Sequence, residues 1–563
     1  MSMPTRFSAL VALCEKLEST TKRKIMVSWV ASFVVQLETQ ETEPAISMLM
    51  GRVFPKWDQR VLEISWNTLS AIIHQISDVD DEAFARAFGK TGDVGDAVRT
   101  VFEERKVRKQ TTLIQKDLTV LEVRHTFETV SGITGVGSRD RKERLLETLL
   151  SSASPLEAKY LVKIMIGEMR TGFHEGLMEF AVAEAFNTPL EVVQTASMFI
   201  GDIGQVARIA KVEGEQGLRK LGFTMFRPIK PMLAQMAASV AEALEEHEGR
   251  TSFEHKLDGA RIQIHKSSGV VRIFSRRLTE VTENLPDIVE LVLNEVNARE
   301  AILEGEVVAV GKDGTPMPFQ HVMRRFRRVQ EVKQAVEAIP VRLYLFDALY
   351  VDGQSLINRA YLKRRKRLSE VAGRITLAEQ IVTENVQAAE QFLQMAIQAG
   401  HEGLMAKKPD SPYTPGVRGK RWFKIKVILE PLDLVIVAAE YGYGRRHGWL
   451  SDYYLAARDP QSNNLSTVGK TFKGLTDTEI IGLTQRLKQL AISKQGNKVL
   501  VKPKVVVEVA YNEIQKSPKY ECGMALRFAR ITRIRDDKAP EEADSIQKVR
   551  EIYQRQFKKK ARR

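Results

Sequence analysis

Pro228 and Pro231 mark the strongest change of pattern along this chain, because apolar residues are spaced differently on their two sides. Between Phe7 and about Phe226, apolar residues recur at three- and four-residue intervals, the period of a helix that packs through one face. Beyond the prolines the pattern changes to the alternation of half-buried strands. Two closely spaced prolines break helical periodicity, since each lacks an N–H and disfavours helix in the preceding residue. The sequence therefore predicts an all-α domain over residues 1–222, followed by a domain that mixes helices with strands.

The length of the chain requires more than one hydrophobic core. Its 563 residues correspond to roughly three or four domains of about 150 residues each. From Leu432 onward short apolar strands recur around a helical stretch at Thr476–Leu490, which favours an OB-type β-barrel, a common nucleic-acid platform. We expect an α+β domain at 223–429 and the barrel at 430–563, ending in a basic tail. The expected barrel strands are Leu432–Ala439, Tyr453–Ala457, Thr467–Phe472, Val505–Tyr511 and Leu526–Ile534.

The charge balance points to a polyanionic partner. The chain carries 85 lysines and arginines against 71 acidic residues, a net charge of +14, with an isoelectric point near 9.5. Such a chain suits nucleic acid or a membrane surface. We find no apolar run long enough to span a bilayer and no signal peptide, so we expect an intracellular protein of the cytoplasm or nucleoid. Cys14 and Cys522 are too few for a disulfide framework or a cysteine-based zinc site.

Two glycine-framed turns in the helical part are candidate contacts to DNA. Glycines up to Gly137 run into Ser138, which we expect to cap the following helix and leave free N–H groups for a phosphate. Further on, Arg170 lies in a glycine-framed turn that ends at Gly172. An ordinary interhelical turn explains each of them equally well. Together with the basic run at 106–109 they indicate sequence-independent contacts to the phosphates of a duplex.

Lys256 is a candidate covalent nucleophile. It precedes a probable turn at Asp258-Gly259, and strand-like alternation over Arg261–His265 follows at once, so Lys256 is expected at the end or beginning of a strand. A lysine amine attacks phosphorus or carbon once it is deprotonated. A free lysine has a pKa of about 10.4, and burial and neighbouring cations favour its neutral, nucleophilic form. The alternative is a surface lysine beside a turn, the commonest position for this residue type.

Three further strands carry acidic or aromatic residues in informative places. Glu304 and Glu306 are two residues apart, which puts both on one face of a strand and makes a metal or ribose role plausible. Tyr344 and Phe346 also share a face, suited to stacking on a base or to a hydrophobic core. Glu402 brings a carboxylate to the start of another strand.

A fourth strand carries two lysines on one face. Trp422, Lys424 and Lys426 alternate with apolar residues and therefore point to the same side. Two lysines on one strand face repel each other unless an anion lies between them. A polyphosphate satisfies this arrangement.

Six short motifs follow one another in a fixed order between Lys256 and Lys426. They read K-L-D-G, S-R-R, E-G-E, Y-L-F-D, E-G-L-M-A-K and W-F-K-I-K. Each is a weak signal alone, but all six in this order are specific. The sequence resembles the lysine-dependent nucleotidyltransferases, that is, polynucleotide ligases and mRNA capping enzymes.

The resemblance implies a role for each matching residue. Lys256 would take AMP through a phosphoramidate bond, Glu254 would contact adenine and Phe346 would stack on it. Glu306 would contact ribose or a divalent metal, and Glu402 would help to hold the metal. The cationic contacts to sugar and phosphates would come from Arg261, Arg276, Arg418, Lys424 and Lys426.

The C-terminal end carries a further motif of the same kind. Arg535 and Lys538 fit an R-x-D-K motif, which in the ligases orients the pyrophosphate leaving group, although Ala529 stands where the family usually has proline. A helical domain, an adenylylation domain and a barrel in this order resemble the replicative ATP-dependent DNA ligases of the archaeal and eukaryotic type. The implied reaction passes AMP from ATP to lysine, then to the 5′-phosphate at a nick, before the 3′-hydroxyl seals the strand. Such ligases would act in replication, repair and recombination.

The same resemblance implies the cofactors and partners. We expect ATP, Mg²⁺ (for which Mn²⁺ can substitute), nicked double-stranded DNA and a monomeric enzyme without membrane contact. A sliding clamp is a candidate partner, and Gln110–Ile114 is a candidate docking peptide, although this segment lacks aromatic anchors. The alternatives are an RNA ligase, a GTP-using capping enzyme and a non-catalytic DNA-encircling scaffold. The helical domain and the R-x-D-K motif disfavour an RNA ligase and a capping enzyme. A scaffold would have no need for the nucleophile. An NAD⁺-dependent ligase is disfavoured because the chain has no cysteine zinc module.

Overall fold

The structure divides into two units. The computed structural model describes residues 4–55, 58–104, 117–311, 313–317, 319–326, 332–416, 418–426, 429–462 and 464–561. The first unit comprises Met1–Lys90, Val94–Ala389 and Met405–Lys424, and the second comprises Thr91–Asp93, Glu390–Leu404 and Ile425–Arg563.

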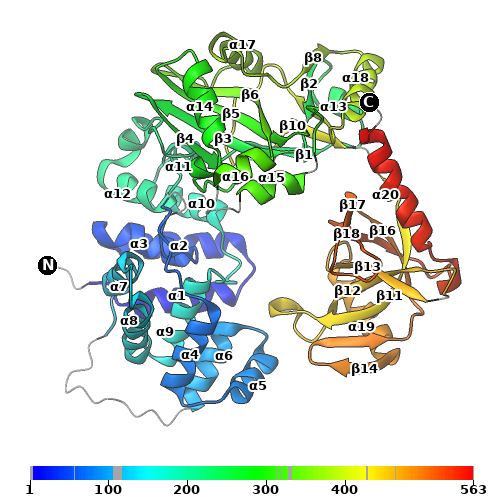
Figure 1. The fold of residues 1–563 in the computed structure, drawn as a ribbon. Helices are drawn as coiled ribbons and strands as arrows, with labels where there is room; N and C mark the ends of the chain where they lie inside the picture. The colour runs from blue at the N-terminus through cyan, green and yellow to red at the C-terminus, as the bar shows by residue number, and fades with distance from the viewer. Residues whose placement is uncertain are drawn as a thin grey trace. The chain divides into compact units, whose positions relative to one another are not determined.

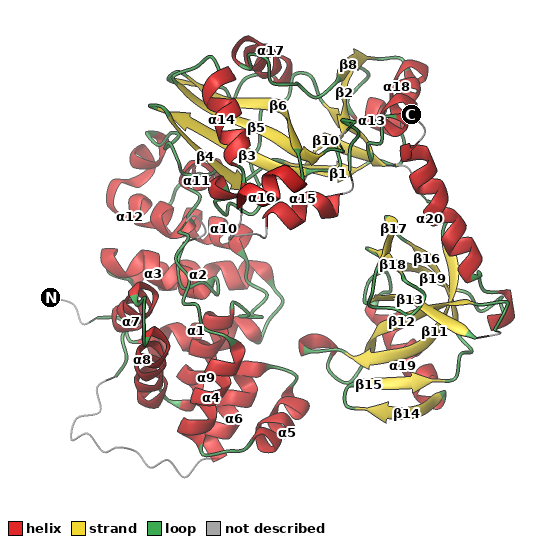
Figure 2. Cartoon of the chain, viewed as in Figure 1, coloured by secondary structure: helices red, strands yellow, loops and turns green. Residues whose placement is uncertain are grey.

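The N-terminal part of the first unit is helical, as predicted (Figures 1 and 2). No strand lies among its described residues from Phe7 to Arg219, and its apolar faces share one core. Several of the helices begin at a capping residue: at α9, Ser154 and Glu157 each accept a hydrogen bond from the other's N–H, and Pro155 takes the first helical position. The helices are α1 (Phe7–Glu18), α2 (Arg23–Gln36), α3 (Thr39–Leu49), α4 (Trp66–Ser77), α5 (Asp81–Thr91), α6 (Val94–Glu104), α7 (Val120–Gly132), α8 (Ser138–Ser152), α9 (Pro155–Ile166), α10 (Glu175–Ala185), α11 (Leu190–Ile200) and α12 (Ile203–Arg219).

Two five-stranded sheets follow the helices. One has the order β1-β10-β9-β2-β8 and the other β4-β3-β5-β6-β7 (Figure 2). The strands are β1 (Leu233–Met236), β2 (Thr251–Lys256), β3 (Ala260–Ser267), β4 (Val270–Ser275), β5 (Glu300–Ala309), β6 (Val341–Val351), β7 (Gln354–Ser355), β8 (Gln380–Thr383), β9 (Gly403–Lys407) and β10 (Arg418–Lys426). The helices between them are α13 (Val240–Glu246), α14 (Pro286–Glu295), α15 (Phe319–Phe326), α16 (Val332–Ala338), α17 (Tyr361–Val371) and α18 (Val386–Gln398). In Figure 1, α14 covers β4 and α17 covers β6, so the second sheet buries one face under helices.

Strand β3 uses its two faces differently. Ile262 and Ile264 enter the hydrophobic core of the second sheet, whereas Gln263 and His265 lie on the opposite face. That polar face holds the segment that leaves the helical part: Phe226 N–H donates to His265 Nδ1 at 3.1 Å, and Ile229 N–H donates to Gln263 Oε1 at 2.9 Å. Burial lowers the pKa of His265 to about 3, so the ring remains neutral and can accept this hydrogen bond.

The C-terminal part belongs to the second unit and is β-rich, as predicted (Figure 1). Its central strand is β11, which pairs with β12 on one edge and with β15 and β16 on the other. The elements are β11 (Leu432–Tyr441), β12 (Leu450–Arg458), β13 (Leu465–Thr471), α19 (Asp477–Gln489), β14 (Ala491–Gln495), β15 (Lys498–Val501), β16 (Val506–Ala510), β17 (Glu513–Lys516), β18 (Met524–Arg527), β19 (Arg530–Ile534) and α20 (Ile546–Ala561).

The strand prediction for this part was incomplete. The expected set of five strands omitted β14, β15 and β17, and it joined β18 and β19 into a single strand. Strand β14 is exposed along its whole length, so its sequence shows no apolar alternation. Phe528 interrupts the last expected strand because its φ is +55°, in the left-handed region. The basic C-terminal run, expected as a tail, continues helix α20 as far as Ala561.

Candidate active site

Lys256 lies where the chain passes from one sheet of the first unit to the other. It is the last residue of β2, it is half-buried, and β3 begins at Ala260 after a short turn. This confirms the prediction that the lysine lies at a strand end. The turn packs tightly, because a Cβ at Gly259 would lie 2.4 Å from the carbonyl oxygen of Val307 and 2.8 Å from Cγ of Glu306. Glycine at this position therefore lets the lysine-bearing turn approach β5 closely.

The two carboxylates of β5 differ in their surroundings. Glu306 is half-buried and stands opposite Arg261 in the β3–β5 register. Glu304 is almost fully buried, and its Oε2 accepts a hydrogen bond from Arg261 Nη2 at 2.7 Å. Glu304 is thus the carboxylate that binds the Arg261 guanidinium directly, and the predicted contact of Glu306 to ribose or metal stays a prediction.

Arg261 is held by several groups of the first unit. Besides Glu304, its guanidinium donates to the carbonyl oxygen of Met232 at 2.8 Å and to the hydroxyl of Tyr413 at 3.2 Å. Burial by itself would lower the pKa of Arg261, but the charges of Glu304, Tyr413 and Glu306 and the hydrogen bond to Glu304 together outweigh it, so the pKa is raised. The guanidinium is therefore a fixed, permanently charged group, and its predicted contact with sugar or phosphates stays a prediction.

A buried ion pair lies beside the nucleophile strand. Nζ of Lys407 lies 2.6 Å from Oε2 of Glu254, and both side chains are at most 2% exposed. The ammonium is also surrounded by aromatic rings, with the centroids of Phe346, Tyr361 and Trp422 at 4.6, 4.7 and 4.5 Å. Burial lowers the pKa of Lys407, although the charge of Glu254 opposes this effect. Lys407 thus contacts both Glu254 and Phe346, the two residues that are predicted to contact adenine.

Lys407 has no role in the sequence prediction, although it is the last residue of the E-G-L-M-A-K motif. The only sequence signal is a lysine at the end of an apolar strand, which is also the usual position of a solvated lysine. Its pairing with Glu254 depends on β9 and β2 being neighbours in the sheet. A single sequence does not contain that information.

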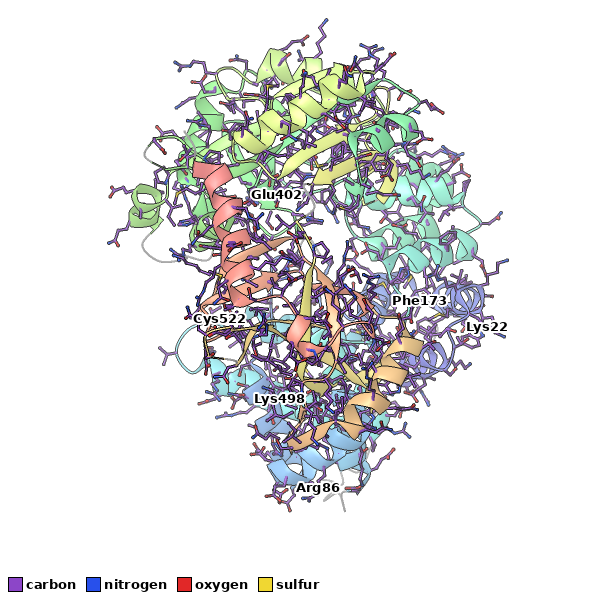
Figure 3. The ribbon with its side chains drawn as sticks, turned by 90° about the vertical axis from the view of Figure 1, so that its right-hand side faces the viewer. Lys22, Arg86, Phe173, Glu402, Lys498 and Cys522 are labelled. Atoms are coloured by element: carbon purple, nitrogen blue, oxygen red, sulfur yellow. The ribbon has the colours of Figure 1, made fainter. Side chains whose placement is uncertain are left out.

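The predicted phosphate contacts lie on several elements. Arg276 is exposed in the turn after β4, and Lys424 is half-buried on β10. Arg418 begins β10, but its side chain lies outside the described residues. In the second unit, Nζ of Lys426 lies 2.7 Å from Oε2 of Glu402, which is labelled in Figure 3. The predicted metal ligand and the predicted phosphate contact therefore neutralise each other in this structure.

Arg535 and Lys538 converge on one carboxylate of the second unit. Arg535 Nη1 and Lys538 Nζ lie 3.0 and 2.6 Å from Oδ2 of Asp433, on β11. Arg535 also donates to Asp537, and that hydrogen bond is the main reason why the pKa of Arg535 is raised and that of Asp537 is lowered. The two predicted pyrophosphate contacts are thus held side by side by Asp433, a residue that the sequence did not single out because it lies in an otherwise apolar strand.

Comparison with known proteins identifies the family. The model "ATP dependent DNA ligase domain" matches residues 231–426, "DNA ligase N terminus" matches 6–183, and "ATP dependent DNA ligase C terminal region" matches 446–538. The chain belongs to the ATP-dependent DNA ligase family.

The relatives cover nearly the whole chain. "DNA ligase 1" of Korarchaeum cryptofilum is 45% identical over 551 residues, which is 98% of each chain. "DNA ligase" of Thermococcus fumicolans is 44% identical over 561 residues, 99% of this chain and 100% of the relative. The solved structure of Pmar-Lig_Pre. has the same fold over 94% of this chain and 99% of its own, with a TM-score of 0.56 at 18% identity. The three-part architecture predicted from the sequence is that of DNA ligases.

One of the two turns of this ligase that were predicted to meet DNA has a different local structure from the one expected. Helix α8 begins at Ser138, but its N-cap is Gly137, which has a φ of +71° and makes no side-chain hydrogen bond. The prediction of a serine cap was wrong, because a left-handed glycine ends the preceding turn one residue earlier. Arg170 also has a positive φ, +54°, and its guanidinium lies 2.8 Å from Glu168 Oε2; Gly172 follows at a φ of +72°.

Several further predictions concern partners of the ligase. The basic run at 106–109 and the segment Gln110–Ile114 lie outside the described residues. The described helices include none with the length and apolar character needed to cross a membrane. Within the described part of the chain, no three His, Cys, Asp or Glu side chains gather as a metal site. Mg²⁺ does not require such a cluster, because one or two carboxylates together with substrate phosphates hold it in nucleotide-processing enzymes.

Proposed function

We propose that this ATP-dependent DNA ligase seals nicks in duplex DNA by carrying AMP on Lys256. The observation that supports this most directly is the position of Lys256: it is half-buried at the junction of two sheets, two residues from Glu254, and the turn that follows it packs against Glu306 at Gly259. The family models on either side of the junction match the DNA ligase N terminus and C-terminal region, which favours DNA over RNA or a cap as the acceptor.

The proposed reaction has three balanced steps. The neutral amine of Lys256 attacks the α-phosphorus of ATP, a P–N bond forms and pyrophosphate leaves as the α–β P–O bond breaks. An oxygen of the 5′-phosphate at the nick then attacks that phosphorus, and the P–N bond breaks to return the amine. Finally the 3′-hydroxyl attacks the 5′-phosphate, the new phosphodiester forms and AMP leaves.

The surrounding residues would position these groups. We assign the adenine to Glu254 and Phe346, the ribose to Glu306, and phosphate contacts to Arg276, Arg418, Lys424 and Lys426. Arg535 and Lys538 would orient the leaving pyrophosphate, and Gly137, Ser138, Arg170 and Gly172 would contact DNA phosphates.

Mg²⁺ is the proposed metal cofactor. The carboxylate of Glu306 fits it, because this hard oxygen donor is half-buried beside the lysine-bearing turn, where the phosphates of ATP would complete the coordination. Glu402 is the second candidate ligand, and it would have to give up its ion pair with Lys426 in order to bind the metal. The metal would neutralise phosphate charge, and Mn²⁺ would substitute for it because it accepts the same oxygen ligands.

The biological setting follows from the substrate. A nick-sealing enzyme would act on the chromosome in replication, repair and recombination, which places it in the cytoplasm or nucleoid. All three matched family domains lie in one chain, and we propose that this chain acts as a monomer. A sliding clamp is the proposed protein partner.

Labelling with α-³²P-ATP and Mg²⁺ tests the proposal. The native chain, first discharged with pyrophosphate, should retain label on a denaturing gel, and Lys256→Ala should not. Lys366→Ala, which removes an exposed lysine from α17, is the matched control and should label normally. Addition of nicked duplex should release the label and seal the strand. Label that persists on Lys256→Ala would overturn the assignment.

A further inference from the structure

Glu254 and Lys407 form a buried ion pair in which each charge compensates the other. Burying a carboxylate and an ammonium is costly unless each compensates the other. The other acidic side chain near Lys407 already has its own partner, because Asp347 binds Arg364 through both oxygens at 2.8 and 2.9 Å. Among the described residues, Lys407 is the cation that neutralises Glu254.

Only half of the Glu254 carboxylate is used by this ion pair. Oε2 faces Lys407, whereas Oε1 is buried and has no hydrogen-bond partner among the described residues. Buried carboxylate oxygens nearly always accept a hydrogen bond, so this one is a candidate acceptor for a donor group of a bound molecule. The atom can only accept, since an ionised carboxylate has no proton to donate.

Oε1 of Glu254 lies close to residues that are proposed to bind the nucleotide. Glu254 and Lys256 are two residues apart on β2, so their side chains lie on the same face of the strand. Lys407 in turn contacts the ring of Phe346, with Nζ 4.6 Å from its centroid. The free acceptor therefore lies on the nucleophile's side of the sheet and next to the aromatic residue proposed to stack on the base.

We propose that Lys407 is a positioning residue for base selection: its ion pair with one oxygen of Glu254 orients the carboxylate, so that the other oxygen accepts a hydrogen bond from the 6-amino group of adenine and repels the 6-oxo group of guanine. This inference rests on the proposed lysyl-AMP chemistry and adds a determinant of nucleotide choice. An adenine amine donates to the carboxylate, whereas guanine and hypoxanthine would place a carbonyl oxygen against it.

Removal of the lysine charge should change the chemistry of Glu254 as well as its position. A buried carboxylate without a counter-ion is destabilised and takes up a proton. The protonated group donates an O–H, which a 6-oxo group accepts. The loss of Lys407 should therefore weaken use of ATP and improve the relative use of GTP and ITP.

The experiment measures initial rates of lysyl-nucleotide formation by the discharged full-length chain with ATP, GTP and ITP. ITP isolates the 6-position, because it lacks the 2-amino group of GTP. In Lys407→Met the ATP:ITP and ATP:GTP rate ratios should fall by about tenfold or more, the range of a charge-assisted hydrogen bond that selects a substrate. Lys407→Arg, which keeps the charge, should retain ratios within about threefold of the native chain.

Lys408→Met is the matched control. Lys408 is the next residue, but its ammonium pairs with the exposed Glu248 at 2.7 Å, so its loss should leave the ratios unchanged. Glu254→Gln removes the charge directly and should lower the ratios in the same direction. If Lys407 acts through Glu254, adding Lys407→Met to Glu254→Gln should change the ratios less than about twofold, because the two effects share one interaction.

Two outcomes would refute the inference. One is a folded Lys407→Met whose ATP rate falls while both ratios stay native, which indicates a structural role alone. The other is fully additive effects in the double variant. Should Lys407→Met lose its native melting transition, Lys407→Gln gives the same readout, since it is neutral and still polar. Failure of the proposed function is distinguishable, because the native chain would then take no label from ATP or Lys256→Ala would retain it.

Discussion

Replacement of Gly259 by alanine should slow adenylylation through a displacement that the structure defines. The added Cβ would lie 2.4 Å from the carbonyl oxygen of Val307, about 1 Å short of ordinary van der Waals contact. Val307 belongs to the middle of β5, which β3 and β6 hold on both edges, so the turn that carries Lys256 must move instead. A misplacement of about 1 Å at a reacting centre can cost a factor of about 10² in rate.

The assay is the single-turnover rate of label transfer from α-³²P-ATP to the discharged chain. We expect Gly259→Ala to be slower by about 10²-fold while its melting transition stays near native, because the change is confined to one turn. Gly419→Ala is the control: this glycine lies on β10, and a Cβ there would meet nothing within 4 Å. A folded Gly259→Ala that labels within about threefold of the native rate would show that Lys256 tolerates this displacement and would refute the argument.

Three further predictions concern stability, pH and the order of the steps. Arg364→Met should lower the free energy of unfolding by about 3–5 kcal/mol, because it leaves Asp347 buried without its cation; urea denaturation checks this, and Asp347→Asn added to it should restore part of the loss. Burial lowers the pKa of His265 to about 3, against about 6.5 in the unfolded chain, so its contribution to stability is complete above pH 6.5 and is lost as the pH falls toward 3. Urea midpoints between pH 7.5 and 4 should therefore fall less steeply in His265→Gln than in the native chain, and equal slopes would contradict this. Arg535→Ala should slow lysyl-AMP formation by about 10²-fold but leave the sealing of a nick that already carries a 5′-adenylate unchanged. Equal losses of rate in both assays would show that Arg535 acts in DNA binding or in folding instead.

The secondary structure was predictable wherever one face of an element is apolar. Helical periodicity up to the prolines gave an all-α region, and alternation gave the strands that carry Lys256, Glu306 and Lys424. Strand β14 was missed because every residue in it is exposed, so nothing in its sequence distinguishes it from a loop. Ser138 was assigned as a cap from its residue type, yet Gly137 in a left-handed conformation takes that position.

Within the candidate site, the sequence identified the chemistry but not the partners. It singled out the nucleophile and the acidic and basic residues around it, because their types and spacing are local properties. It assigned Arg261 to the nucleotide, but could not show that Glu304 holds this guanidinium at 2.7 Å. It likewise gave no role to Lys407 or to Asp433.

The sequence by itself determined the order of the three parts, the family and the identity of the lysine that is proposed to carry AMP. Only the tertiary structure decided which charges compensate one another: Lys407 with Glu254, Glu304 with Arg261, and Asp433 with Arg535 and Lys538. The physical reason is that periodicity records which side of an element is buried, whereas an ion pair between distant segments depends on which strands become neighbours. Burial then sets the energetic weight of each pair, and burial is a property of the folded chain alone.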